Sequence, residues 1–532
     1  MKSLKKILAA LTCAVLVIGT VAALASSKPI VAEAAGETVN VVNAVISGNK
    51  VLVQTASASI PSSDDGVFRL LSQKVNEAGA QGTVVASMPA ASNVDFVFDL
   101  KLNTADSNLF NHFTVAVMRG GVLTPVSDTR YITNPEAVSG KSAARMVVGK
   151  KGILPAASYF GTAASGIKPL GIQQVVYNLP MNDLFLPGAS IAYSYNGKTY
   201  NFNRSIVNQY DYLVPMLNRQ GVQVTIILLN NLTSDVTLIH PLARGAACPY
   251  YSINVVDTAA VERLQALASF LGERYSGTKE LGQVDNWILG NEVNARGSWH
   301  YLNTTDVNYF VQEYAKAFRI FYNGIKSKNS NANVYINIDS EWTTASNVVH
   351  FTGKAFLDSF NSQMSASGNV NWSLSHHPHN APLFVPASWA NPSRYVQNSV
   401  NTPYISVQNL SVLTDYMSQP AFLSPSGEVR SIILSEVGYT SSGGEAVQAA
   451  SIAYAYMQAE VNQHIDGIMI CRELEDAYEV SQGLAFGLRH VDGTPKVSYN
   501  WYAQLGTPGQ QAVLDAASSV MGQSIFNLLT PR

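Results

Sequence analysis

The sequence predicts an α/β protein in which a (β/α)8 barrel follows an N-terminal domain resembling a β-sandwich. Three observations lead to this prediction. From Gly149 onward apolar segments alternate with helical segments, and the apolar segments number eight. The residues before Gly149 form short segments in which apolar and polar residues alternate, separated by turn signals. A length of 532 residues leaves room for a barrel of about 250 residues or more and at least one further unit.

The predicted barrel strands are short apolar runs, in chain order Gly152 to Leu154, Ile172 to Tyr177, Val222 to Leu229, Trp287 to Leu289, Val334 to Ile338, Val370 to Leu374, Ile432 to Leu434 and Ile468 to Ile470. Helical spacing or helix-favouring composition marks Ile206 to Gln220, Thr258 to Tyr275, Asp306 to Lys326, Lys354 to Met364 and Gly444 to Gln463. A last helix, from Gln510 to about Leu528, is expected to pack against the barrel wall. A doubly wound open sheet is the lesser alternative, because no nucleotide-binding glycine motif supports it.

The chain divides into four expected parts: a signal peptide at 1–34, a β-sandwich accessory domain at 37–148, a catalytic barrel at 149–505 and a C-terminal helix at 506–532. Lysines precede an apolar run from Ile7 to Leu24, which is typical of a secretory signal peptide, with a retained membrane anchor as the alternative. We therefore expect bacterial-type export to the cell surface or medium, with no membrane contact after cleavage. The sandwich either binds carbohydrate or is a structural module, and Asp64 with Asp65 forms either a Ca²⁺ site or a solvated turn.

Composition excludes several classes of function. Hydrophobic residues make up 47% of the chain, charged residues 13%, and the formal net charge is −2, which gives no electrostatic reason to propose nucleic acid as a partner. Only Cys248 and Cys471 lie beyond the signal, which leaves a single disulfide or two small buried side chains as alternatives. Serine-hydrolase, zincin and Cys-x-x-Cys redox motifs are missing from the sequence.

Two of the predicted strands end in a glutamate. Glu292 follows Trp287 to Leu289 in the sequence V-D-N-W-I-L-G-N-E-V-N, and Glu436 follows Ile432 to Leu434 in S-I-I-L-S-E-V-G-Y. Parallel barrel strands end at one common rim, so these side chains are expected to form a carboxylate pair there. Long loops at Leu184 to Ser205 and Asn230 to Asp257 follow barrel strands and are expected to rise on the same face.

This pattern resembles the clan A retaining glycoside hydrolases or an uncharacterised bacterial branch related to them. The enzymes of that clan are (β/α)8 barrels with an Asn-Glu pair after strand four and a glutamate after strand seven. By that resemblance Glu292 is the acid/base, Glu436 is the nucleophile and Asn291 binds the sugar hydroxyl next to the anomeric centre. The usual Asn-Glu-Pro is Asn-Glu-Val here, with Val293 in the place of proline. The implied activity is hydrolysis of a β-linked glycan by double displacement, with no cofactor.

Further polar and aromatic residues are expected at this rim. Candidate substrate-binding residues are Asn178, His377, His379, Trp342, Trp299, Tyr439 and Arg472. Aromatic side chains of this kind stack on the apolar faces of sugars, and histidines hydrogen-bond to sugar hydroxyls. Each has a structural alternative, since a strand-end tryptophan also seals a core and an arginine also pairs with the acids that follow it.

Two other functions stay open. A degenerate barrel can bind a glycan without cleaving it, and the cluster of His376, His377 and His379 is also a feature of metal-dependent hydrolases. We expect no metal, because the further ligands of such enzymes are not found in the sequence. The expected partner is an oligo- or polysaccharide substrate, and the expected oligomeric state is a monomer.

Overall fold

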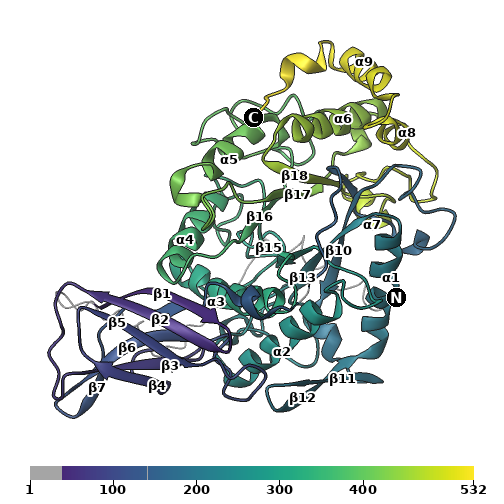
Figure 1. Ribbon diagram of the computed structural model, residues 1–532. Helices are drawn as coiled ribbons and strands as arrows, with labels where there is room; N and C mark the ends of the chain where they lie inside the picture. Colours follow the sequence, from purple (N-terminus) through teal and green to yellow (C-terminus); the bar gives the residue numbers. More distant parts are fainter. Residues whose placement is uncertain (1–38, 141) are drawn as a thin grey trace.

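The computed structural model describes residues 39–140 and 142–532, and the predicted signal peptide at 1–34 lies outside these residues. The described chain forms a closed barrel of parallel strands with helices around it, and an antiparallel domain at one side of the barrel (Figure 1). The predicted fold class is therefore confirmed. None of the helices in the described part of the chain combines the length and apolar character needed to cross a bilayer.

The N-terminal domain consists of two antiparallel sheets. One contains β1 (Val39–Ser47), β2 (Lys50–Ser57) and β5 (Asn93–Asp99). The other contains β4 (Thr83–Pro89), β3 (Val67–Gln73), β6 (His112–Arg119) and β7 (Val122–Pro125), with β8 (Arg130–Tyr131) paired to β6. Alternate residues of β5 are buried, which is the period of a strand with one face on a core. The two acids considered for Ca²⁺ are engaged by protein groups: Asp64 accepts the N–H groups of Gly120 and Gly121, and Asp65 pairs with Arg69.

Eight parallel strands close the barrel in the order β10 (Gln174–Pro180), β13 (Gln223–Leu229), β14 (Asn286–Leu289), β15 (Asn333–Ile338), β16 (Ser373–His376), β17 (Ile432–Val437), β18 (Ile465–Ile470) and β9 (Lys151–Ile153). Each predicted strand overlaps one of them. The sixth begins later than predicted, at Ser373, because the carbonyls of Val370 and Trp372 accept hydrogen bonds from the buried Arg430.

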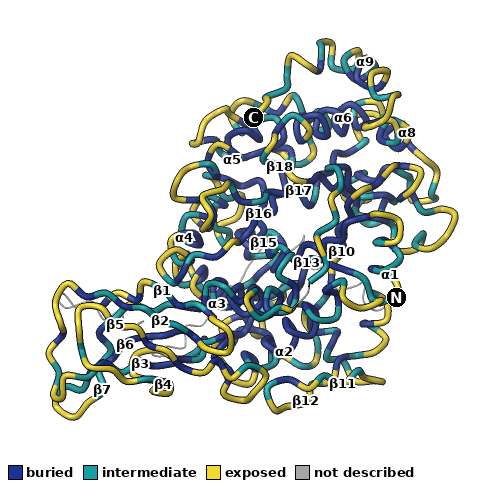
Figure 2. The backbone as a smooth tube through the Cα atoms, in the orientation of Figure 1, coloured by how far each residue is buried: buried dark blue, intermediate teal, exposed yellow. Residues whose placement is uncertain are grey.

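The helices cover the outside of the barrel, whose strands are almost wholly buried (Figures 1 and 2). The helices that follow the strands are α1 (Arg204–Arg219), α2 (Thr258–Arg274), α3 (Val307–Lys326), α4 (Gly353–Ala366), α5 (Leu410–Met417), α6 (Glu445–Val461), α7 (Ala477–Ser481) and α8 (Val497–Gln504). The last helix, α9 (Gln510–Met521), is shorter than predicted, because Gly522 adopts a left-handed conformation that ends it.

Apolar side chains fill the barrel interior: Val176, Ile227, Leu229, Ile288, Tyr335, Ile433 and Met469. They occur at alternate positions of their strands, as expected when every second residue points inward. Tyr250, from the long loop after β13, packs on this group. That loop therefore covers the end of the barrel at which the strands finish, as predicted.

The other long loop takes a different course. It forms a hairpin of β11 (Ser190–Tyr195) and β12 (Lys198–Asn203), as predicted, but the hairpin packs on α2 and the sandwich. Phe202 stacks on Phe270 of α2 at 4.1 Å, and Lys198 pairs with Glu262. The prediction that this loop rises on the barrel face of Glu292 and Glu436 was wrong, because its aromatic residues pack on the outer surface of α2.

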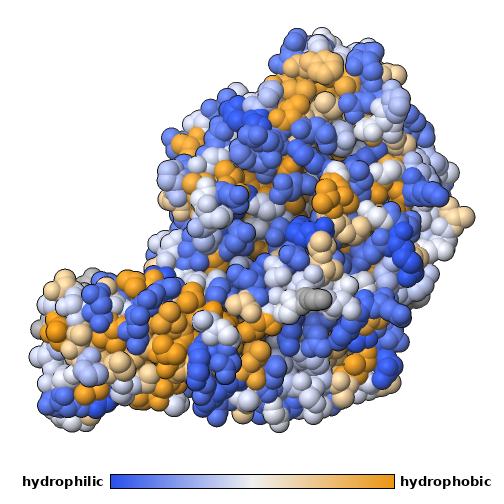
Figure 3. Space-filling view, viewed as in Figure 1, coloured by the Kyte–Doolittle hydropathy of each residue, from blue (hydrophilic) through white to orange (hydrophobic). Residues whose placement is uncertain are grey.

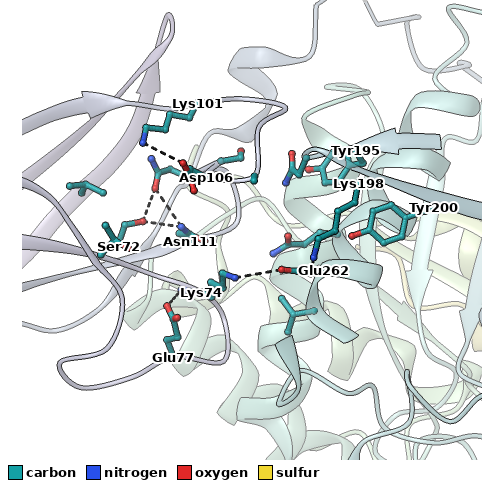
Figure 4. A pocket seen from close by; sticks show the side chains of 18 residues that line it. Ser72, Lys74, Glu77, Lys101, Asp106, Asn111, Tyr195, Lys198, Tyr200 and Glu262 are labelled. Carbon is teal, nitrogen blue, oxygen red and sulfur yellow. Dashed lines mark hydrogen bonds and ion pairs between the residues drawn. The ribbon is translucent and has the colours of Figure 1, made fainter. Parts of the chain in front are cut away.

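Where the hairpin meets the sandwich, the two domains enclose a cavity of about 290 Å³ (Figure 4). Charged side chains from both domains line it, among them Lys74, Lys101 and Asp106 on the sandwich side and Glu262 on α2. Most are already paired, for example Lys74 with Glu262 and Lys101 with Asp106. The residues discussed in the next section do not line this cavity.

Candidate active site

The turn after β14 places Glu292 in an unusual backbone conformation. Glu292 has φ +39°, in the left-handed region that residues with a side chain rarely adopt, and Gly290 just before it has φ +79°. The conformation is held by β15, since the Glu292 N–H donates to the Asn337 Oδ1 and the Val293 N–H donates to the Asn337 carbonyl at 3.1 Å. Strain of this kind persists only where the surroundings fix it, and it is concentrated at functional sites.

A second pair of bonds fixes the same turn one step further along. The Asn294 amide donates to the Asp339 carboxyl at 2.6 Å, while the Asp339 N–H donates to the Asn294 Oδ1 at 3.0 Å. Both side chains are buried. Burial, with the charges of Glu292 and Glu341, raises the pKa of Asp339 well above its usual value. The buried Asp339 side chain thus supports the turn through Asn294.

Glu436 reaches the barrel mouth through an irregularity in β17. Ser435 and Ile433 share the inward face of that strand, so a regular alternation would turn Glu436 outward. The pairing of β17 with β18 shifts register between Leu434 and Val437, as in a β-bulge. Such a bulge re-aims the side chain beside it, and the Glu436 side chain is accordingly one-third exposed and lies within reach of the inward-facing His377.

Two histidines from the end of β16 connect the glutamates. His377 Nδ1 lies 2.9 Å from Glu292 Oε1 and 3.9 Å from Glu436 Oε2. His379 Nε2 lies 3.7 Å from Oε1 of each glutamate. The structure thus brings together four side chains that the sequence predicts at the rim, from three different strands.

The histidines control the charge of this cluster. Burial opposes ionisation of Glu292, but hydrogen bonds from His377 and His379 hold its pKa well below the usual value. Burial likewise opposes a charge on His379, yet Glu292 and Glu436 together raise its pKa. In the free site the two histidines therefore favour the ionised form of Glu292, and the two glutamates favour the protonated form of His379.

Beneath these four residues lies a layer of buried polar side chains that sequence analysis missed. Asn337, Ser375 and Ser435 point into the barrel from β15, β16 and β17, and they are fully or almost fully buried. Asn337 Nδ2 donates to the Ser375 Oγ at 2.8 Å and approaches His377 Nε2 at 3.1 Å, and the Ser435 Oγ lies 2.9 Å from the same nitrogen. The period of two, counted forward from the inward-facing Tyr335 and Ile433, would have indicated Asn337 and Ser435.

The remaining predicted residues fall into two groups, of which the first lies at the mouth. Trp299 is partly exposed and stacks on Tyr250 with ring centroids 5.3 Å apart. Asn178 is exposed and lies two residues beyond the inward-facing Val176, so it faces the mouth. Asn291 lies in the turn beside Glu292 and is 5% exposed.

The second group is sealed in the core, which corrects two predictions. Trp342 is 1% exposed, donates its Nε1–H to the Val400 carbonyl at 2.9 Å and packs edge-on against Tyr416. Tyr439 is also 1% exposed and belongs to the main hydrophobic core. Neither side chain has surface to offer a sugar, because both point to the helix side of the strands.

Arg472 lies close to Glu436 but is already paired. Its guanidinium donates to Glu479 at 2.6 Å, and the charge of Glu436 contributes to the raised pKa of Arg472, against burial. Burial raises the pKa of Glu479 to about 7, with Arg472 opposing this and Glu436 adding to it. Cys471, just before Arg472, forms no disulfide with Cys248.

A metal could be held by only part of the predicted histidine cluster. Glu292, His377 and His379 offer ligand atoms within 4.8 Å of one another, the one such group among the described residues. His376 is not a member: it points out of the barrel, and its Nε2 lies 3.2 Å from the Ile405 carbonyl. Burial lowers the pKa of His376 to about 3. The alternative metal set with His376 is therefore wrong.

Fold and site together define a closed parallel (β/α)8 barrel whose strand ends gather two carboxylates and two imidazoles. The chain belongs to the family described as "Family of unknown function (DUF5722)", whose model matches residues 143–528. No curated protein matches the chain.

Solved structures similar to the chain include two glycosidases. One is a family 39 glycoside hydrolase from Bacteroides cellulosilyticus WH2, at 15% identity and a TM-score of 0.44, covering 88% of this chain and 79% of that one. Another is a β-glucosidase from Pyrococcus furiosus, at 13% identity and a TM-score of 0.44, covering 67% and 85%.

Proposed function

We propose that the protein is a glycoside hydrolase that cleaves β-linked glycans with retention, using Glu436 as nucleophile and Glu292 as acid/base. The observation that carries this proposal is the approach of both carboxylates to one imidazole nitrogen, His377 Nδ1, at 2.9 Å and 3.9 Å. In this proposal 149–505 is the catalytic barrel, 37–148 an accessory domain and 506–532 a segment packed on the barrel. The protein acts as a monomer outside the cytoplasm on oligo- or polysaccharides.

The spacing of the carboxylates supports retention. Glu292 Oε1 and Glu436 Oε2 can be no further apart than the sum of their two distances to His377 Nδ1, 2.9 Å and 3.9 Å. Retaining enzymes hold their carboxyl groups about 5–5.5 Å apart, and inverting enzymes about 6.5–9.5 Å apart. This maximum separation of the two oxygens admits every distance in the retaining range but only the shortest distances in the inverting range.

The reaction then takes two steps. In the first, a Glu436 oxygen attacks the anomeric carbon, the glycosidic C–O bond breaks, and the leaving oxygen takes a proton from Glu292. In the second, Glu292 removes a proton from water, the water oxygen bonds to the anomeric carbon, and the ester bond to Glu436 breaks. His379 holds the proton that Glu292 needs at the outset, because its Nε2 lies 3.7 Å from both carboxylates and its pKa is raised despite burial.

The stacked pair of Trp299 and Tyr250 supports sugar binding beside the carboxylates. The two residues come from the loops after β14 and β13, and the Tyr250 ring rests on the apolar barrel interior. An aromatic face that is partly exposed and rigidly backed suits the C–H face of a pyranose. Trp342, which the sequence also suggested for this task, has no exposed face.

The test is release of reducing sugar from plant, fungal and bacterial glycans by wild type, Glu292→Gln and Glu436→Gln, each with and without chelator. We expect one glycan class to be hydrolysed by wild type, in chelator as well, and hydrolysis to fall by about 1,000-fold or more in both variants. Wild-type activity that disappears with chelator and returns with Zn²⁺ or Mn²⁺ would favour a metal-dependent hydrolase. Tight glycan binding by all three proteins without product would favour a binding protein.

A further inference from the structure

Asn337 occupies the centre of the buried layer under the carboxylates. It lies on β15, is fully buried, and contacts four groups that belong to β16, β17 and the Glu292 turn. Its Oδ1 accepts the backbone N–H of Glu292, and its Nδ2 faces Ser375, Ser435 and His377 Nε2. A single amide thus touches both the backbone of the acid/base and the ring that binds its carboxylate.

The chemistry of the partners fixes the orientation of this amide. A backbone N–H can only donate, so the atom of Asn337 that faces the Glu292 N–H must be the oxygen. The nitrogen must then face the other side, toward Ser375 and His377. The opposite orientation would set the amide nitrogen against the Glu292 N–H, donor against donor in a buried site.

That orientation determines the proton of His377. Nε2 faces the Nδ2–H of Asn337 at 3.1 Å, so it is an acceptor and carries no proton. The Ser435 hydroxyl, 2.9 Å away, can donate to the same nitrogen and accept from the Ser375 hydroxyl at 2.6 Å. The proton of a neutral His377 is therefore on Nδ1, which lies 2.9 Å from Glu292 Oε1.

We propose that Asn337 is a positioning residue that fixes His377 as its neutral Nδ1–H tautomer, so that His377 always donates a hydrogen bond to Glu292. The role rests on the proposed glycosidase function. The donated bond stabilises the carboxylate that forms when Glu292 gives its proton to the leaving oxygen, and it holds that carboxylate in place for the second step. The same tautomer disfavours a metal at this position, because Nδ1, the atom that would bind it, already carries a proton.

The first test measures the tautomer itself. Histidine labelled with ¹⁵N in the full protein gives signals for nine residues, and His377→Gln identifies those of His377. We expect Nε2 to show the downfield shift of an unprotonated ring nitrogen and Nδ1 that of an N–H. In Asn337→Asp, which keeps an oxygen toward the Glu292 N–H, an acceptor replaces the donor and Nε2 is expected to gain a proton. A protonated Nε2 in the wild-type protein would overturn the proposal.

The second test separates a role in proton donation from a role in folding. The sugar and linkage found active in the glycan panel are used as two aryl glycosides, one with a good leaving group that needs no proton and one with a poor leaving group. Asn337→Asp is expected to lower kcat/KM for the poor leaving group by about 10-fold or more relative to the good one. Ser373→Ala, a buried serine one layer below on β16, is the matched control and should change both substrates equally or not at all.

The two tests distinguish this inference from the proposed function. Nε2 without a proton in a protein that hydrolyses no glycan would support the tautomer and contradict the glycosidase. An active enzyme in which Asn337→Asp lowers both aryl glycosides by the same factor would support the glycosidase and contradict the positioning role.

Discussion

At the scale of single residues, the site is organised by histidine rather than by glutamate alone. His377 and His379 each approach both carboxylates, and their hydrogen bonds hold the pKa of Glu292 below its usual value. In the proposed mechanism Glu292, as acid/base, therefore depends on a proton held nearby by His379. Substituting His379 should therefore change the pH dependence of catalysis more than it changes the affinity for substrate.

We predict that His379→Gln moves the alkaline limb of the kcat/KM profile to lower pH, on the order of one unit. The alkaline limb marks loss of the catalytic proton, which His379, with its raised pKa, holds in the proposed wild-type site and which Glu292 must hold alone in the variant. His350→Gln is the control, because His350 lies 3.1 Å from Glu341 rather than from Glu292. An alkaline limb that stays in place or moves to higher pH would contradict this account of the charge.

The two tryptophans at the strand ends should behave in opposite ways. Trp299→Ala is expected to raise KM about 10-fold and to leave the melting temperature nearly unchanged, since it removes an exposed platform. Trp342→Ala should lower the free energy of unfolding by about 3–5 kcal/mol, because it empties a core site. Calorimetry and steady-state kinetics on both variants check this, and the reverse pattern would return Trp342 to the substrate site.

At the scale of elements, the sequence predicted where the strands lie and which of them end in glutamates. Periodicity and composition suffice for that, because each strand is a short apolar run between helical segments. The hairpin of β11 and β12 was placed on the wrong face, since its partners on α2 and the sandwich are distant in sequence. The bulge that turns Glu436 inward was equally out of reach, because it depends on the pairing of β17 with β18.

The sequence analysis also missed the buried polar network beneath the two histidines. Asn337, Ser375 and Ser435 are ordinary residues in apolar strands, and only their common depth in the closed barrel turns them into a network. Trp342 and Tyr439 were expected at the rim because of their position after strands, but position along a strand does not reveal on which side of the sheet a residue lies when the strand ends in a turn.

Just before β14 lies a buried carboxyl group, Asp285, whose effect on the free energy of unfolding depends on pH. Burial raises the pKa of Asp285 to about 6, with Arg145 opposing this. A raised pKa means that stability is greatest below the ordinary value of 3.8 and is lost as the pH rises through 6. Asp285→Asn should therefore gain on wild type by about 1–3 kcal/mol between pH 4 and pH 8. Melting temperatures across that range test this, and a gain that shrinks with pH would contradict it.

At the scale of the whole molecule, the sandwich and the barrel share a buried seam. The amide of Asn323 on α3 donates to the Leu109 carbonyl at 2.9 Å, and the Tyr131 N–H of β8 donates to the Ser367 carbonyl at 2.9 Å. Hydrophobic residues on the visible face gather over the sandwich, whereas hydrophilic residues are more frequent over the barrel (Figure 3). The sandwich is thus attached to the barrel through defined contacts.

We predict that wild type unfolds in one calorimetric transition and that Asn323→Leu lowers its midpoint or divides it in two. The leucine has a similar size but leaves the Leu109 carbonyl without its donor, at a cost of about 1–3 kcal/mol. Asn43→Leu is the matched control, because that amide donates to Gln54 within the sandwich. Equal effects of the two substitutions would show that the seam does not couple the domains.

The central claim is that Glu436 attacks the sugar and Glu292 transfers the proton. The most direct measurement is rescue by azide of Glu436→Ala and Glu292→Ala on an activated aryl β-glycoside, with the anomeric configuration of the product read by NMR. We predict an α-glycosyl azide from Glu436→Ala, by one direct displacement, and a β-glycosyl azide from Glu292→Ala, by displacement of the enzyme-bound sugar. The same configuration from both variants, or azide products with the roles exchanged, would contradict the assignment.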